Sequence, residues 1–141
     1  MTYNKTLTKF LDAQNQMYLQ ALAEVRNGRK ESHWMWFIFP QLKGLGSSDT
    51  ARFYAINDLE EAEAFLNHPI LGSHLLEITR VLLQHEDKAP SEIFPHPDDL
   101  KLHSSITLFS LVENSDPLFD EVLTNFFEGN PDQKTVALLR N

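Results

Sequence analysis

Lys101, Ser104 and Ser105 are polar residues within a segment whose other side chains are mostly apolar. On a helical wheel, apolar residues cover most of the circumference of segment 98–112, which predicts a central helix. Burying an ammonium or hydroxyl group without a partner is costly. These residues therefore either form one wall of a pocket for a small anionic or sugar-like ligand, or find their polar partners in solvent and in their own helix. In the local alternative the lysine extends to solvent and the serines bond to carbonyls of the preceding turn.

Aromatic side chains are concentrated between Trp34 and Phe39, directly before Pro40. Aromatic residues bury large areas, so most of this segment is expected in the core. Trp34 and Trp36 are two residues apart, and on a helix they point in different directions. One of them could pack inward while the other lines a cleft and stacks on a ligand. Burial of the whole segment is the alternative.

A glycine-rich stretch, Gly44-Leu-Gly46-Ser-Ser48, precedes an expected short helix. Free backbone N–H groups at such a point can bind a phosphate. Asp49 places a negative charge there, however, and two glycines alone are weak evidence. We therefore favour a tight turn in which Ser48 or Asp49 caps the helix.

Metal and cofactor motifs are absent from the sequence. The chain has no cysteine, which excludes disulfides and cysteine nucleophiles, and it contains no P-loop, G-x-S-x-G or H-E-x-x-H pattern. His68 and His74 are six residues apart and fall on different helix faces. His74 and Glu77 could share a face, but two ligands make a poor site. The sequence predicts no metal site and no cofactor.

Helices must position these residues, because nearly every segment between proline and glycine carries a helical pattern. We expect an all-α single domain spanning residues 1–141, with about seven or eight helices, several of them short. Segment 33–39 would also suit a buried strand, but no second strand is available to pair with it. Ser32, Asp58 and Asp98 are the expected helix caps. The expected ranges are 8–27, 33–39, 49–54, 58–66, 69–84, 99–112, 117–129 and 131–140, with a turn at 91–94.

Composition limits the class of partner. Twelve basic and 20 acidic residues give a net charge of −8, which argues against general nucleic-acid binding. The N-terminus has no apolar signal core, and the longest apolar run, 34–39, is far shorter than the roughly 20 residues of a membrane-spanning helix. We therefore expect a cytoplasmic protein that does not associate with membranes.

Three strings carry a family resemblance: residues 28–48, 65–72 and 98–109. They resemble a bacterial family of unknown function, domain-of-unknown-function family 1810, some of whose members carry a calpastatin-like label that contributes nothing to the prediction. The resemblance covers nearly the whole chain and implies an all-helical single domain. The family's recurring polar and aromatic positions are matched here by Gln14, Lys30, His33, Trp34, Trp36, Gln41, Ser48, Tyr54, His68, Lys101, Ser104, Ser105 and Thr107.

Two positions depart from that family. His74 stands where relatives often have arginine, and Pro95 where they often have glycine. If the arginine contacts an anion in relatives, His74 weakens that contact here. Segment 68–79 is also faintly similar to an all-helical family that removes ADP-ribose or ribose from nucleotides.

Three functions remain open at this point. The first is binding of a small anionic or nucleotide-like metabolite in a polar pocket beside the central helix. The second is hydrolysis of an N-glycoside or nucleotide, with His33 or His68 as acid or base. The third is a protein-interaction domain with an exposed aromatic segment. The predicted binding residues are Gln14, His33, Trp34, Trp36, Gln41, Ser48, Tyr54, His68, Lys101, Ser104, Ser105 and Thr107.

Overall fold

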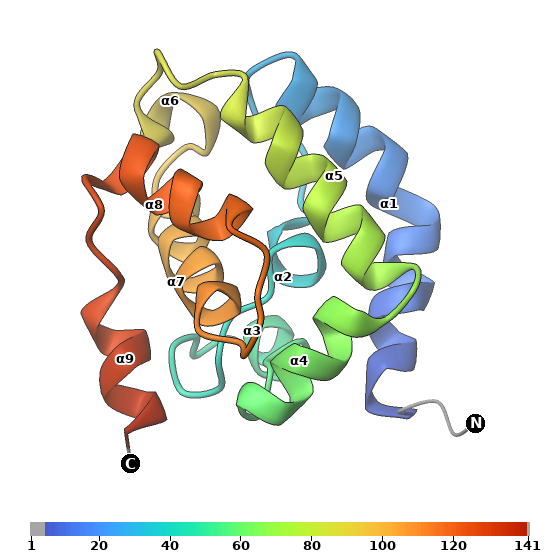
Figure 1. The fold of residues 1–141 in the computed structure, drawn as a ribbon. Coiled ribbons are helices and arrows are strands. Elements are labelled where there is room, and N and C mark those ends of the chain that lie inside the picture. Colours follow the sequence, from blue (N-terminus) through green and yellow to red (C-terminus); the bar gives the residue numbers. More distant parts are fainter. Residues whose placement is uncertain (1–4, 141) are drawn as a thin grey trace.

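Helices account for all the regular elements of the computed structural model, which describes residues 5–140. The all-α prediction is confirmed, with nine α-helices and one 3₁₀ turn in the described range, slightly more than expected (Figure 1). The elements are η1 Lys5–Leu7, α1 Thr8–Arg26, α2 Met35–Ile38, α3 Asp49–Phe53, α4 Leu59–Asn67, α5 Leu71–Leu83, α6 Pro90–Ile93, α7 Asp98–Ser110, α8 Leu118–Phe127 and α9 Gln133–Leu139.

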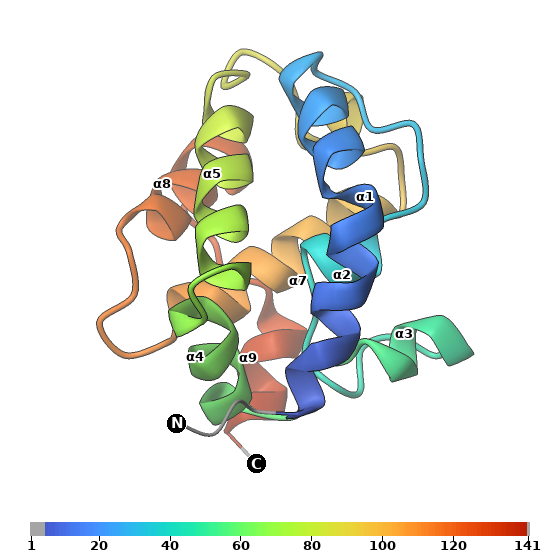
Figure 2. The ribbon, with the colours of Figure 1, turned by 90° about the vertical axis from the view of Figure 1, so that its right-hand side faces the viewer.

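Helices α1 and α5 are distant in sequence, but they lie side by side and run in the same direction (Figures 1 and 2). Their hydrogen bonds advance together along both helices, from the Gln14–His74 pair to Tyr18–Glu77. Both helices are amphipathic, and each turns its buried stripe inward. Within the described part of the chain, no helix is long and apolar enough to cross a bilayer.

Helix α7 is the central helix, as its apolar circumference predicts. It contacts α4, α6, α8 and α9, and Leu102, Ile106 and Phe109 are fully buried. Two polar residues of this helix, His103 and Thr107, bind the loop that leads into α9. His103 Nε2 donates to the Asn130 carbonyl, and the fully buried Thr107 accepts a hydrogen bond from the backbone N–H of Asp132 at 2.9 Å.

The aromatic segment adopts a short helix, α2, rather than a strand, as expected. Trp34 and Phe39 are fully buried and Phe37 nearly so. The chain then leaves the core in a long excursion that carries α3 (Figure 2) and returns through a single parallel bridge between Leu42 and Ile56. That bridge closes the excursion at its base.

Helix caps account for most differences from the expected ranges. Ser48 and Asp58 cap α3 and α4 as predicted. The predictions for Ser32 and Asp98 are wrong: the Ser32 hydroxyl donates to Glu24, and the Asp98 carboxylate pairs with lysines. In both cases a partner distant in sequence replaces the local cap. The expected turn at 91–94 is the short helix α6.

We expect Gly72→Ala to destabilise the protein by about 1–3 kcal/mol, as overpacking in a core does. A Cβ at this position would lie 1.9 Å from the carbonyl oxygen of Leu66, so α4 and α5 would have to separate. Urea unfolding measures the change. Arg80→Ala, on the exposed face of the same helix, is the control and should change the free energy of unfolding by less than about 0.5 kcal/mol. Equal stability of the two variants would contradict the close packing at Gly72.

Candidate functional site

A hollow of about 360 Å³ lies beside the first half of α7, and we call it the α7 hollow. It brings the predicted binding residue Gln41 together with two others, Lys101 and Ser104, which lie on α7 far from it in sequence. Gly46 of the glycine-rich stretch also reaches it. The complete lining is Gln41, Leu45, Gly46, Pro97, Leu100, Lys101, His103, Ser104, Asp132 and Lys134.

Lys101 is held in place by two contacts. Its Nζ lies 3.5 Å from Asp98 Oδ1 and 5.2 Å from the centre of the Trp36 ring, a cation–π arrangement. Asp98 is shared, because the buried Lys30 binds its other oxygen at the shorter distance of 2.7 Å. Two ammonium groups therefore face one carboxylate, and one positive charge remains uncompensated at the edge of the hollow.

Asp132 is the one carboxylate that lines the α7 hollow, and hydrogen bonds occupy it. It caps α9 by accepting from the backbone N–H and the hydroxyl of Thr135, at 3.2 and 2.6 Å. Ser104 donates to the same oxygen at 2.9 Å. Sequence reasoning missed Asp132, although its place directly after Asn130-Pro131 marks it as a helix cap.

His103 forms a rigid part of the wall. Its Nε2 donates to the carbonyl oxygen of Asn130 at 2.6 Å, and its ring stacks on Phe127 with 4.1 Å between ring centres. Since the carbonyl can only accept, Nε2 carries a proton. This ring is therefore fixed by the loop that leads into α9.

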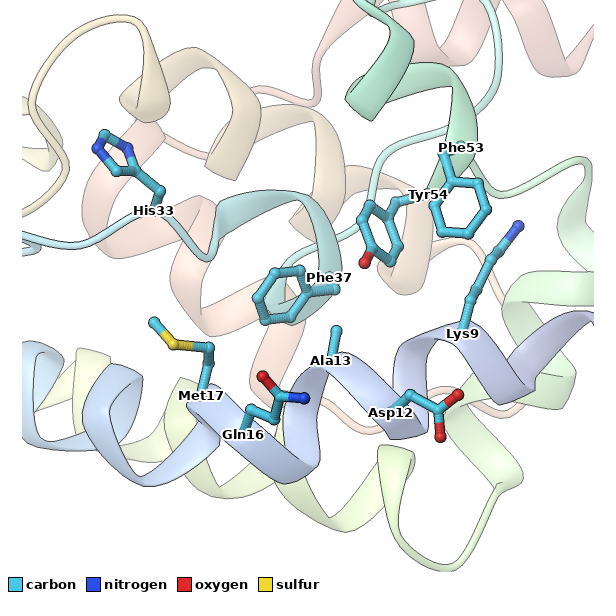
Figure 3. A pocket seen from close by; sticks show the side chains of 9 residues that line it. All are labelled: Lys9, Asp12, Ala13, Gln16, Met17, His33, Phe37, Phe53 and Tyr54. Carbon is cyan, nitrogen blue, oxygen red and sulfur yellow. The ribbon is translucent and has the colours of Figure 1, made fainter.

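A second hollow, of about 480 Å³, lies between α1, α2 and α3, and we call it the α1–α3 hollow (Figure 3). It contains two further predicted residues, the exposed His33 and the half-buried Tyr54. The predicted set is thus divided between two places. The lining of this hollow is Lys9, Asp12, Ala13, Gln16, Met17, His33, Phe37, Phe53 and Tyr54.

The two tryptophans lie in different environments. Trp34 is fully buried and its indole N–H donates to Glu24 at 2.9 Å. Trp36 is half-buried and lies beneath Lys101. Trp36 lines neither hollow, so its observed contact is with the lysine that does.

Five other predicted residues line neither hollow, and four of them make hydrogen bonds within the protein. Gln14 is buried and donates to the carbonyl of Phe37 at 2.7 Å. His68 Nδ1 accepts from the backbone N–H groups of Ile70 and Leu71, at the start of α5. Ser48 caps α3, and Thr107 binds the backbone of Asp132. The Ser105 hydroxyl is fully buried and has no hydrogen-bond partner among the described residues.

Glu24 is a buried carboxylate that the sequence did not single out. Its oxygens accept from the backbone N–H groups of Glu31 and Ser32, the Ser32 hydroxyl and the Trp34 indole, at 2.7–2.9 Å. Burial raises the pKa of this carboxyl, but the four hydrogen bonds outweigh burial and lower the pKa to about 2. An isolated glutamate on a helix carries no sequence signal for such a role.

A polar cluster joins α1 to α5 around His74. Gln14 donates its amide N–H to the Phe37 carbonyl, and its Oε1 accepts a hydrogen bond from His74 Nδ1 at 2.7 Å. The His74 ring also stacks on Tyr18, with ring centres 3.6 Å apart. Burial lowers the pKa of His74, although Glu77 opposes this change. Burial also raises the pKa of Tyr18, which donates to Glu77.

Comparisons with known proteins agree with the all-helical fold and show the family. The chain belongs to the family described as "Protein of unknown function (DUF1810)", which matches residues 4–139. It is similar to the crystal structure of the conserved hypothetical protein Rv1873 from Mycobacterium tuberculosis, with 47% identity, 96% of each chain covered and a TM-score of 0.93. The family predicted from the three sequence strings is confirmed. None of the curated proteins matches the chain.

Ser104→Ala and Ser105→Ala should change the free energy of unfolding by different amounts or in opposite directions, although the two residues are neighbours. Ser104→Ala removes a hydrogen bond to a carboxylate and should lower the free energy of unfolding by about 1–2 kcal/mol. Ser105→Ala removes a buried, unpaired hydroxyl and should leave stability unchanged or raise it. Urea unfolding of the two variants measures this, and a greater loss in Ser105→Ala would contradict the assignment.

Glu24→Gln should lower stability by about 2 kcal/mol or more at pH 7, because the amide cannot accept from all four donors. The carboxyl pKa is lower in the folded protein than its ordinary value of 4.5. The stabilisation by ionised Glu24 is thus complete above pH 4.5 and is lost as the pH falls towards about 2. Urea unfolding at several pH values should show the difference between the two proteins shrinking in this range. A pH-independent difference would exclude this role.

Proposed function

We propose that this protein binds a small anionic metabolite, such as a phosphorylated or carboxylated sugar-sized compound, in the α7 hollow. The observation that carries the proposal is a pair of lysines at the hollow whose charges are not fully paired. Lys101 shares the Asp98 carboxylate with Lys30, and Lys134 makes no ion pair among the described residues. The Asp132 carboxylate also lines the hollow, but its Oδ2 already accepts hydrogen bonds from Ser104 and Thr135. Two lysines beside one occupied carboxylate favour an anionic ligand.

The size and lining of the hollow support a small ligand. Its volume of about 360 Å³ is near the lower end of the range of roughly 300–1,000 Å³ for ligand sites. Leu45, Pro97 and Leu100 supply apolar wall, which suits the carbon skeleton of a metabolite. Leu100 is 56% exposed, so a ligand that covered it would also remove apolar surface from water.

Each polar residue has a distinct role in this proposal. Lys101 and Lys134 neutralise the anionic group, and the Gln41 amide orients the rest of the ligand. Ser104 and His103 bind the protein itself and keep the wall rigid. A lysine that is already positioned by Trp36 and Asp98 loses less conformational freedom when a ligand binds.

The other two hypotheses have less support from the geometry. An exposed aromatic contact surface requires accessible side chains, but five of the six residues of segment 34–39 are buried. For hydrolysis, His68 lines neither hollow, and His33 lines the α1–α3 hollow, apart from the lysines of the α7 hollow. The cationic hollow therefore supports binding best.

A thermal-shift screen with inorganic phosphate, sugar phosphates, nucleotides, ADP-ribose and NAD tests the proposal. A ligand at 100 times its Kd stabilises the folded state by about 2.7 kcal/mol, or several degrees in Tm. We expect at least one of these anions to raise Tm and the shift to decrease with added salt.

Lys101→Met and Lys134→Met should each reduce that shift, since each removes one positive charge from the hollow. Lys134 is exposed and unpaired, so its replacement leaves the fold intact. Lys43→Met removes an exposed lysine outside the hollow and is the matched control. Absence of any shift, or equal shifts in all three variants, would overturn the proposed function.

A further inference from the structure

The α1–α3 hollow has features of a second ligand site that are independent of the α7 hollow. Aromatic rings from two elements form its wall. The Tyr54 ring lies 5.4 Å from that of Phe37 and 4.8 Å from that of Phe53. Met17 of α1 adds a polarisable thioether to this lining (Figure 3).

Phe53 is the most informative residue of the wall. Its side chain belongs to α3, which has no buried residue, and it is 56% exposed. The ammonium group of Lys9 lies 5.3 Å from its ring centre, at the edge of the same hollow. A large aromatic ring held open to solvent beside a cavity provides a surface on which a planar ligand can stack.

Polar groups also line the hollow. The exposed Asp12 carboxylate, the exposed Gln16 amide and the half-buried Tyr54 hydroxyl make no hydrogen bond or ion pair within residues 5–140. The Gln16 amide and the Tyr54 hydroxyl project into the space between α1 and the opposite wall (Figure 3). The hollow thus offers one anionic acceptor, the Lys9 ammonium group and two neutral polar groups to the edge of a ligand.

We infer that the α1–α3 hollow binds a planar nitrogen heterocycle of nucleobase size that carries an exocyclic amino group. The ring stacks on Phe53 and contacts Phe37 and Met17. The amino and ring N–H groups donate to the Asp12 carboxylate, and the Tyr54 hydroxyl and Gln16 amide bind the remaining edge atoms. The volume of about 480 Å³ accommodates a bicyclic ring and part of a substituent.

Titration of ¹⁵N-labelled protein with guanosine, followed by ¹H–¹⁵N NMR, tests this inference. Purine riboside, which has the same bicyclic ring system without the exocyclic groups, is the comparison ligand. We expect saturable shifts at residues 9–17, 37 and 53–54, with guanosine bound more tightly than purine riboside. Asp12→Asn should remove most of this preference by weakening guanosine about tenfold, since a hydrogen bond to a charged acceptor becomes a neutral one. Phe53→Ala should weaken both nucleosides about tenfold through loss of stacking.

Two exposed residues outside the hollow supply matched controls. Asp120→Asn removes an exposed carboxylate on α8, and Leu19→Ala removes a side chain that is 80% exposed on α1. Neither should change the affinity for guanosine, and Lys101→Met should not change it either. The inference is overturned if guanosine gives no saturable shifts at millimolar concentration. It is also overturned if the shifts lie elsewhere, or if Asp12→Asn and Phe53→Ala bind guanosine as well as their controls do.

Discussion

The arrangement around α7 depends on one partly buried carboxylate, that of Asp98. Lys30 binds it from the loop after α1, and Lys101 binds it from the next turn of α7. Removing the acid would leave the buried Lys30 ammonium group without its partner, which costs several kcal/mol. The pair therefore fixes the start of the central helix against the segment that follows α1. It also sets the direction of Lys101, because the shared carboxylate and the Trp36 ring together determine where its ammonium group lies.

Glu24 and Lys30 have opposite charges but perform one task, holding the indole of Trp34. Glu24 accepts its N–H, and the Lys30 ammonium lies 5.2 Å from its ring centre. Neither ion is bound to the other in the described structure: Glu24 is satisfied by neutral donors and Lys30 by Asp98. The two charges thus connect α1 to α7 through an aromatic ring. Because the indole N–H has an acceptor inside the protein, Trp34 can be fully buried without leaving a polar group unpaired.

Much of the fold could be predicted from local sequence signals, whereas the candidate site could be predicted only in part. Helix α7 and the caps Ser48 and Asp58 follow from apolar periodicity and from side chains that bond within their own turn. Ser32 and Asp98 carry the same cap signal, but partners distant in sequence compete for them and prevail. Gln14 is polar among apolar neighbours on its helix, and its partners, Phe37 and His74, are also distant in sequence. Its hydrogen bonds are made within the protein and do not mark a ligand site. Lys101 and Ser104 were recognised because they are polar among apolar neighbours. Asp132 and Glu24 were missed because nothing in their own segments shows what will pack on them.

Segment 34–56 determines how the two hollows relate to each other. Its residues Phe37, Phe53 and Tyr54 line the α1–α3 hollow, while Gln41, Leu45 and Gly46 line the α7 hollow. The segment is fixed at its base by two backbone hydrogen bonds across the bridge: the Lys43 N–H donates to the Ile56 carbonyl, and the Ile56 N–H donates to the Gln41 carbonyl. Its first part is fixed by the buried aromatic core. Among the helices of the described residues, only α3 has no buried residue. Phe37 belongs to the core and also forms wall, whereas Phe53 of α3 forms wall while remaining exposed. A rigid frame with one loosely packed helix can therefore support two hollows.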